Sequence, residues 1–130
     1  MDEFFSKDDL LDLTSMLKYV ERRTEAEIIV RITKDQVMIE QTARGEFSRL
    51  GLDTSDKSLG LLIYINLFQR KFALLAGKKI LDTMGQDWLR DHAEKLSERF
   101  RKYQFGFGIH ELVSTIGNQL ADEFPAPAST

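Results

Sequence analysis

The chain has 130 residues, of which 42% are hydrophobic, and its formal net charge is −3 at pH 7. This length suits one compact domain that buries roughly two thirds of its unfolded surface. An acidic chain lacks the clustered positive charge that nucleic acid backbones require, so we expect no nucleic-acid partner. The absence of cysteine excludes disulfides, thiolate zinc sites and cysteine nucleophiles, and two histidines are too few for a histidine-rich metal cage.

The N-terminal residues MDEFFSKDDL are acidic and lack the basic and long apolar segments of a secretory signal. The longest apolar run, LGLLIYINLF, is too short to span a bilayer. We therefore expect a soluble, cytoplasmic chain without a transmembrane segment.

A first helix is predicted over residues 7–23. Ser6 is followed three residues later by Asp9, which is the spacing of a helix-capping box. Apolar residues then recur at helical spacing, at Leu10, Leu13, Leu17 and Val20. The segment EIIVRIT follows and predicts a strand over residues 27–33, because it is rich in β-branched residues.

The middle of the chain predicts a helix between strands. A helical stripe is formed by Ile39, Ala43, Phe47 and Leu50, and Gly51 is placed to end that helix. The segment LGLLIYIN (59–66) is apolar on both faces, which predicts a central strand covered on both sides. The segment KFALLAG (71–77) follows after too few residues for a crossover, so it should return antiparallel.

Two more helices are predicted after the hairpin. Their apolar stripes are Leu89, Ala93, Leu96 and Phe100, and then Ile109, Leu112, Val113, Ile116 and Leu120. A strand, a crossover helix and a second strand form a βαβ unit with parallel strands. The predicted fold is α/β: a three-layer α/β/α sandwich with a small mixed sheet that contains a βαβ unit and an antiparallel hairpin.

This topology predicts one polar edge of the sheet, where both parallel strands begin and the return strand ends. Carboxylates converge there from Glu27, Asp53 and Asp56, and ammonium groups from Lys78 and Lys79. Calcium and magnesium prefer oxygen ligands, so the carboxylates are candidate metal ligands and the lysines candidate phosphate ligands. The alternative is an ordinary polar rim, because DTSD lacks the glycine and terminal glutamate of an EF-hand loop.

Other catalytic patterns are absent from the sequence. The GFGIH segment has no strand before it, so it predicts a helix entry rather than a dinucleotide site. Neither His92 nor His110 has a serine and an acid at triad spacing. We therefore predict no catalytic residue and no certain cofactor, with calcium or magnesium bound weakly if at all.

Four stretches of the chain, in this order, resemble the TPM domain family: FSKDDLLDL, ERRTEAEIIVRI, LGLLIYINLFQRKFALLAGKKI and DWLRDHAEKLSERFRKYQFGFGIHELVSTIGNQLADEFP. The resemblance implies one TPM domain, over residues 1–124, and the composition of the end of the chain, FPAPAST, predicts a disordered tail at 125–130. The resemblance also implies an α/β/α sandwich, divalent-cation binding and, for the plant lumenal branch, acid phosphatase activity.

Residue by residue, the family's pattern before the first strand resembles Thr24, Ala26, Glu27 and Ile28, and its basic hairpin residue resembles Arg70. Three positions depart from it. Gln69 replaces a usual acidic residue, Gly77 stands at a second acidic position, and Lys79 stands where the family has glycine. The Lys79 ammonium could neutralise Glu27 or Asp56 where relatives use a divalent ion.

Two functions follow as hypotheses. The first is a binding or regulatory domain without catalysis, with weak divalent-cation binding and an unidentified protein partner. The alternative is a metal-dependent phosphatase acting on phosphomonoesters, with Glu27, Asp53 and Asp56 around a cation and Lys78 or Lys79 on the phosphate.

Overall fold

The computed structural model describes residues 5–127 and has an α/β fold with a small mixed sheet, as predicted. The chain separates into two compact units, residues 27–93 and residues 1–26 with 94–130, which are described in turn. None of the described helices is long and apolar enough to cross a membrane. The elements in chain order are α1 (Lys7–Glu21), β1 (Glu27–Thr33), α2 (Ile39–Arg49), β2 (Gly60–Asn66), β3 (Lys71–Ala76), α3 (Lys78–Met84), α4 (Gln86–Arg101) and α5 (Phe105–Glu123).

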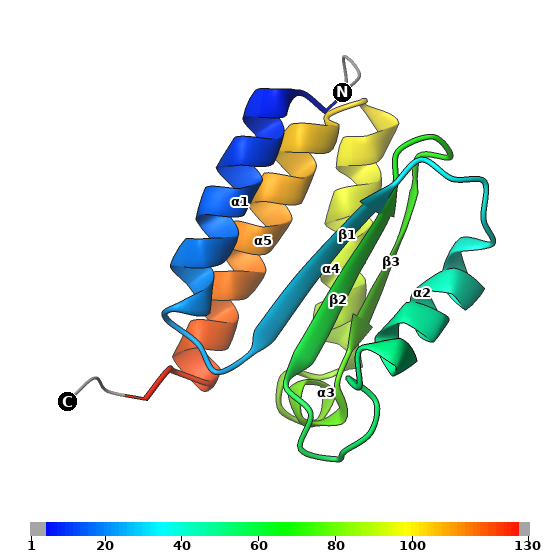
Figure 1. Ribbon diagram of the computed structural model, residues 1–130. Helices are drawn as coiled ribbons and strands as arrows, with labels where there is room; N and C mark the ends of the chain where they lie inside the picture. The colour runs from blue at the N-terminus through cyan, green and yellow to red at the C-terminus, as the bar shows by residue number, and fades with distance from the viewer. Residues whose placement is uncertain (1–4, 128–130) are drawn as a thin grey trace. The chain divides into compact units, whose positions relative to one another are not determined.

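The sheet of the unit 27–93 has the strand order β1-β2-β3 (Figure 1). β1 pairs with β2 in parallel, with Glu27 beside Gly60, and β3 returns antiparallel, with Ala76 beside Leu61. The observed pairing confirms the predicted βαβ unit and hairpin: the connection between β1 and β2 is long enough for a crossover helix, and the one between β2 and β3 is too short for a crossover.

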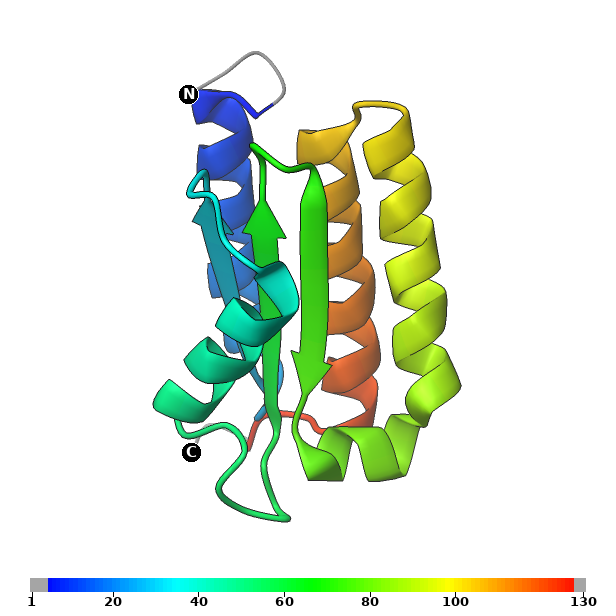
Figure 2. The same ribbon diagram turned by 90° about the vertical axis from the view of Figure 1, so that its right-hand side faces the viewer.

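β2 is the central strand, and all seven of its residues are buried. On one face, Leu62 and Tyr64 pack with Ala43 of α2 and with Leu52, and α2 lies across this face of the sheet (Figure 2). Burial raises the pKa of the Tyr64 phenol, and the nearby carboxylates of Glu46 and Asp35 raise it further. The prediction of a strand that is apolar on both faces is confirmed by this burial.

The short helix α3 was not predicted. It begins directly after β3, with Gly77 at its N-cap, and ends at Gly85, whose φ of 90° is readily adopted only by glycine. Lys78 and Lys79 therefore lie in the first turn of a helix rather than at the end of a strand.

The other unit is built on α1 and α5, which lie side by side (Figure 1). The predicted capping box of α1 is confirmed: the Asp9 amide donates to Ser6 Oγ at 3.0 Å, and the Ser6 amide donates to Asp9 Oδ2 at 2.8 Å. Gly117 lets the helices approach closely, because a Cβ there would lie 3.2 Å from Val20 Cβ and closer still to its methyl groups.

Thr24 ties the segment after α1 to the end of α5. Its buried hydroxyl donates to the Phe124 carbonyl oxygen at 2.7 Å and accepts from the Ala26 amide at 3.1 Å. The first residues of the predicted tail continue this contact, because the Ala126 amide donates to the Arg23 carbonyl at 3.0 Å. Residues 128–130 of that tail lie outside the described residues.

Candidate functional site

The polar edge predicted from the topology is formed by three segments that meet through their backbones. The Glu27 amide donates to the Leu59 carbonyl at 3.0 Å, the Gly77 amide to Gly60 at 2.7 Å, and the Lys79 amide to Ser58 at 3.2 Å. We call the exposed side chains at this edge, Glu27, Asp53, Asp56, Lys78 and Lys79, the rim.

Two side chains of the rim are engaged by their own neighbours. Lys78 Nζ donates to Asp82 Oδ2 at 2.8 Å, and this hydrogen bond raises the pKa of Lys78. Asp53 accepts a hydrogen bond from the Ser48 hydroxyl. Among residues 5–127, no three His, Cys, Asp or Glu side chains form a group that could hold a metal ion. Metal and phosphate binding at the rim therefore stay predictions.

Gly77 packs so tightly at the rim that no side chain fits there. A Cβ at Gly77 would lie 2.8 Å from Ser58 Cβ and closer still to Ser58 Oγ and its carbonyl oxygen. Ser58 is itself held in place, because its hydroxyl donates to the Leu52 carbonyl at 2.6 Å. The space that the family's acidic side chain would need at this position is thus filled by Ser58.

A second polar group lies at the opposite end of the sheet, where β1 and β2 end. Asn66 is fully buried: its Nδ2 donates to the Asp35 carbonyl at 2.6 Å, and its Oδ1 accepts from the Gln69 amide at 2.9 Å. Gln69 Nε2 donates to the Val37 carbonyl at 3.0 Å. We call Asn66 and Gln69 the amide cluster, and it ties the loop after β1 to the β2–β3 hairpin.

Gln69 Oε1 is buried and accepts no hydrogen bond from the described residues. Exchanging the positions of Oε1 and Nε2 would not satisfy both atoms, because Nε2 is needed as the donor to the Val37 carbonyl. The sequence alone identifies Gln69 only as a departure from the family's acidic residue. Its role in joining two loops depends on backbone carbonyls distant along the chain, which leave no spacing signal.

The two loops joined by the amide cluster present the most exposed large hydrophobic side chains of the described chain. Met38, on the loop after β1, is 69% exposed, and Phe68, in the hairpin, is 66% exposed. Met38 is also the N-cap residue of α2, and its side chain makes no capping hydrogen bond. Serine, threonine, aspartate and asparagine are strongly preferred at this position, so methionine is a poor choice for helix stability there.

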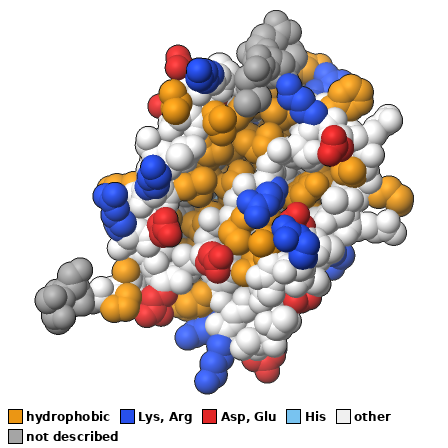
Figure 3. Space-filling view, viewed as in Figure 1, with side chains coloured by type: hydrophobic (Ala, Val, Ile, Leu, Met, Phe, Trp, Pro, Cys, Tyr) orange, Lys and Arg blue, Asp and Glu red, His pale blue; other side chains and the backbone are white. Residues whose placement is uncertain are grey.

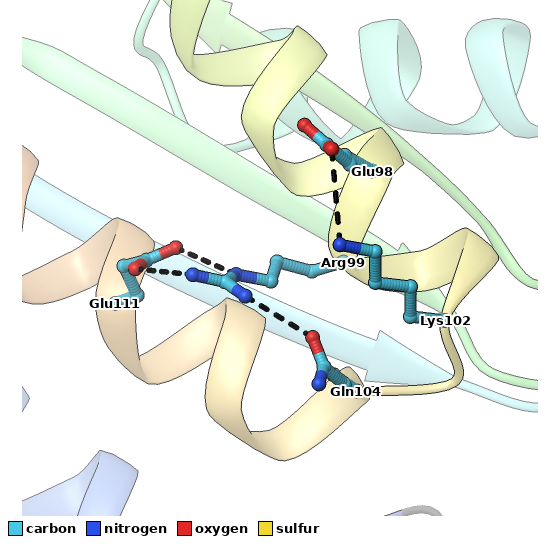
Figure 4. Close-up of polar contacts among 5 residues, drawn as sticks. All are labelled: Glu98, Arg99, Lys102, Gln104 and Glu111. Carbon is cyan, nitrogen blue, oxygen red and sulfur yellow. Dashed lines mark hydrogen bonds and ion pairs between the residues drawn. The ribbon is translucent and has the colours of Figure 1, made fainter.

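In the unit that contains α5, the main charged contact joins α4 to α5 (Figure 4). Arg99 donates from Nε and Nη2 to the two carboxylate oxygens of Glu111, both at 3.1 Å, and from Nη1 to Gln104 Oε1 at 3.2 Å. Its guanidinium also lies 4.5 Å from the ring centroid of the exposed Phe107. The hydrogen bonds from Arg99 lower the pKa of Glu111 and raise that of Arg99. We interpret this group as structural, because the guanidinium of Arg99 and the carboxylate of Glu111 pair with each other within the unit.

The fold and both ends of the sheet can now be compared with known proteins. The chain matches the TPM domain over residues 1–119. It therefore belongs to the TPM domain family. No curated protein matches it significantly.

Solved structures share this fold. The NMR structure of the BA42 protein from the psychrophilic bacterium Bizionia argentinensis superimposes with a TM-score of 0.81 at 23% identity, over 96% of this chain and 87% of the other. The N-terminal domain of a P. gingivalis protein gives 0.75 at 16% identity, over 98% and 84%. The N-terminal domain of the cg2496 protein of Corynebacterium glutamicum gives 0.70 at 13% identity, over 95% and 78%. At these identities the likeness concerns the fold alone.

Proposed function

We propose that this TPM domain is a binding or regulatory module that works without catalysis and contacts a partner protein through Met38 and Phe68. The observation that carries the proposal is the exposed methionine at the N-cap of α2. A residue that neither caps the helix nor enters the core does not serve stability, and local rules of this kind are typically broken at functional sites.

The amide cluster supports this proposal, because it fixes the loops that present both side chains. A contact surface that is already ordered loses little conformational entropy on binding. Aromatic residues and methionine are also enriched in protein interfaces. The neighbouring Arg70 and Lys71 are exposed basic residues, so a partner with acidic residues around an apolar contact suits this surface.

Replacing Met38 tests the proposal through two opposite effects. Met38→Ser supplies a capping hydroxyl and is expected to raise the free energy of unfolding by about 0.5–2 kcal/mol in urea denaturation. The same variant, combined with Phe68→Ser, is expected to lose the partner in quantitative pull-downs from the source cells. The free energy of unfolding of the double variant is measured in the same way, and loss of the partner by a double variant that is at least as stable as the unmodified protein shows that the lost side chains act in recognition.

The matched control replaces two other exposed hydrophobic residues, Leu11 and Tyr19 on α1, which are 58% and 54% exposed. Leu11→Ser with Tyr19→Ser should recover the same partners as the unmodified protein. Recovery of one unchanged set of proteins by both double variants would reject Met38 and Phe68 as the contact.

The alternative function is a metal-dependent phosphatase at the rim, favoured by the backbone contacts that bring its three segments together. A phosphomonoester assay with and without magnesium or calcium distinguishes the two functions. We expect no metal-dependent turnover, because Lys78 is paired with Asp82 and Ser58 fills the space beside Gly77. Turnover that depends on metal and disappears in Asp56→Asn would instead establish the phosphatase.

Weak cation binding at the rim is tested separately, by calcium titration with chemical-shift mapping at residues 53–57. We expect millimolar binding or none. Exchanging Gly77 for aspartate is not a usable test, because Ser58 blocks any side chain there. Lys79→Gln removes an ammonium from the rim and should raise calcium affinity by reducing like-charge repulsion. Lys71→Gln, the same charge change at the opposite end of β3, should not. Equal effects of both variants would reject a rim cation site.

A further inference from the structure

β1 is an edge strand, with β2 on one side and no described strand on the other. The Glu27 amide donates to β2 through the Leu59 carbonyl, and the Thr33 carbonyl accepts from the Leu67 amide. In a parallel pair, alternate residues bond to the neighbouring strand, so the amides and carbonyls of Ile28, Val30 and Ile32 point away from β2. Within residues 5–127, no hydrogen bond uses these outward groups. They form a free pairing edge.

The side chains of β1 are also incompletely covered. Glu27 and Arg31 are exposed, and the four aliphatic side chains between and after them remain half-buried. α2 packs mainly against β2 and β3, so it leaves the outer edge of β1 uncovered within this unit. Figure 3 shows this face of the molecule, on which acidic and basic side chains lie among exposed hydrophobic ones. Exposed edge strands of this kind are templates for pairing with another strand.

We propose that β1 pairs antiparallel with β1 of a second copy of this chain, with Ile29 opposite Ile29 and Glu27 opposite Arg31. Two independent requirements give this register. First, the backbone amides and carbonyls that point away from β2 must face each other in the two copies. This alignment sets Ile28 opposite Val30, and the backbone groups of both residues point away from β2. The alignment also sets each Glu27 carboxylate directly opposite an Arg31 guanidinium, twice in the symmetric pair.

Charge complementarity selects a second copy over an unrelated strand. Exposed charges on an edge strand usually prevent pairing, because most incoming strands leave them unpaired or facing a like charge. A parallel alignment of two β1 strands in register would set Glu27 beside Glu27 and Arg31 beside Arg31. Only the antiparallel alignment centred on Ile29 satisfies all four charges. The product is one continuous sheet of six strands, with β1 and its symmetry mate in the middle.

The contact is small, because it joins one strand of seven residues to another. Interfaces below the standard size are typically weak, so association should become visible only at protein concentrations of roughly 0.1–1 mM. A single charge reversal that sets like charges opposite each other twice should weaken association at least about tenfold.

Charge-swap variants test the register by sedimentation velocity at concentrations from about 10 µM to about 1 mM. The mass of the unmodified protein should rise with concentration toward twice the 15.0 kDa of one chain. Glu27→Arg and Arg31→Glu should each stay monomeric, because each sets like charges opposite each other. An equimolar mixture of the two variants should associate again, since each arginine then faces a glutamate. Glu123→Arg, the same charge change at the exposed end of α5, should associate like the unmodified protein.

Three results would overturn the proposal. The unmodified protein could remain a monomer at every concentration, both single variants could associate like the unmodified protein, or their mixture could stay monomeric. Far-ultraviolet circular dichroism of each variant establishes that it is folded. If one single variant fails to fold, the double variant Glu27→Arg with Arg31→Glu, which restores complementary charges in the same register, replaces it and must associate.

Discussion

At each end of the sheet in the unit 27–93, separate segments of the chain are held together, but by different kinds of contact. At the rim, where β1 and β2 begin, charged side chains are exposed and the close contact is between the Gly77 backbone and Ser58. At the opposite end, neutral amides are buried and join two loops, while hydrophobic side chains are exposed. The rim is held by backbone hydrogen bonds and by the close packing of Gly77 against Ser58, whereas the opposite end is held by hydrogen bonds from buried side-chain amides.

The two ends also differ in whether their exposed side chains have a partner within the chain. Lys78 has Asp82 within its own helix, and Asp53 has the Ser48 hydroxyl. The side chains of Met38 and Phe68, by contrast, remain mostly exposed to solvent. The proposed contact therefore rests on exposed apolar side chains rather than on the cluster of charges that the sequence predicts as a site.

The largest expected effect comes from filling the glycine at the rim. Gly77→Ala should lower the free energy of unfolding by about 1–3 kcal/mol, because the added methyl group overlaps Ser58, including its backbone carbonyl. Urea denaturation measures this. Gly45→Ala, in the exposed middle of α2 where a Cβ meets nothing within 4 Å, should instead raise stability by about 0.5–1 kcal/mol. Equal stability of both variants would show that packing does not fix the rim.

The next effect tests the buried amide at the other end. Asn66→Ala removes both hydrogen bonds of the side chain and leaves the Asp35 carbonyl without its donor, which should cost about 1–3 kcal/mol in urea denaturation. Amide chemical shifts of residues 34–38 and 67–70 should change together, because the two loops lose their connection. Asn118→Ala, an exposed amide that accepts from Arg23, should stay within about 0.5 kcal/mol. Chemical-shift changes confined to one of the two loops would argue against the amide cluster as the connection between them.

Much of the fold could be predicted because the relevant signals are local. Two-sided apolarity identified β2, and short connections determined how β1 and β3 pair with it. The capping box at Ser6 marked the start of α1. α3 gave no such signal, because it is only seven residues long and its N-cap, Gly77, has no side chain. Its position depends on backbone hydrogen bonds to a distant loop.

The candidate sites divide in the same way. The convergence at the rim followed from topology, since strands that begin together bring their flanking residues together. The amide cluster could not be predicted, because the partners of Asn66 and Gln69 are backbone carbonyls 31 and 32 residues away. Every residue type has a backbone carbonyl, so the residue types around Asp35 and Val37 do not indicate that these carbonyls accept hydrogen bonds from Asn66 and Gln69.

The smallest expected effect extends the comparison to a charged pair in the other unit, between Arg99 and Glu111. Hydrogen bonds from Arg99 lower the pKa of Glu111 below its ordinary value of 4.5. A carboxylate with a lowered pKa in the folded state stabilises the protein above the unfolded value, and this contribution is lost as pH falls through the lowered value. Glu111→Gln should therefore lower Tm near pH 7 and leave it unchanged near pH 3.

The change should be only of the order of 1–2 °C, because the side chains of Arg99 and Glu111 are 31% and 38% exposed and water screens the pair. Thermal melts of both proteins between about pH 3 and pH 8 measure the difference. Glu123→Gln, an exposed carboxylate at the end of α5, serves as the control and should show no loss that depends on pH. A loss for Glu111→Gln as large as that for Asn66→Ala would reverse the comparison, because a half-exposed charged pair would then stabilise the protein as much as a buried amide. A difference that persisted at low pH would show that Glu111 acts through packing rather than charge.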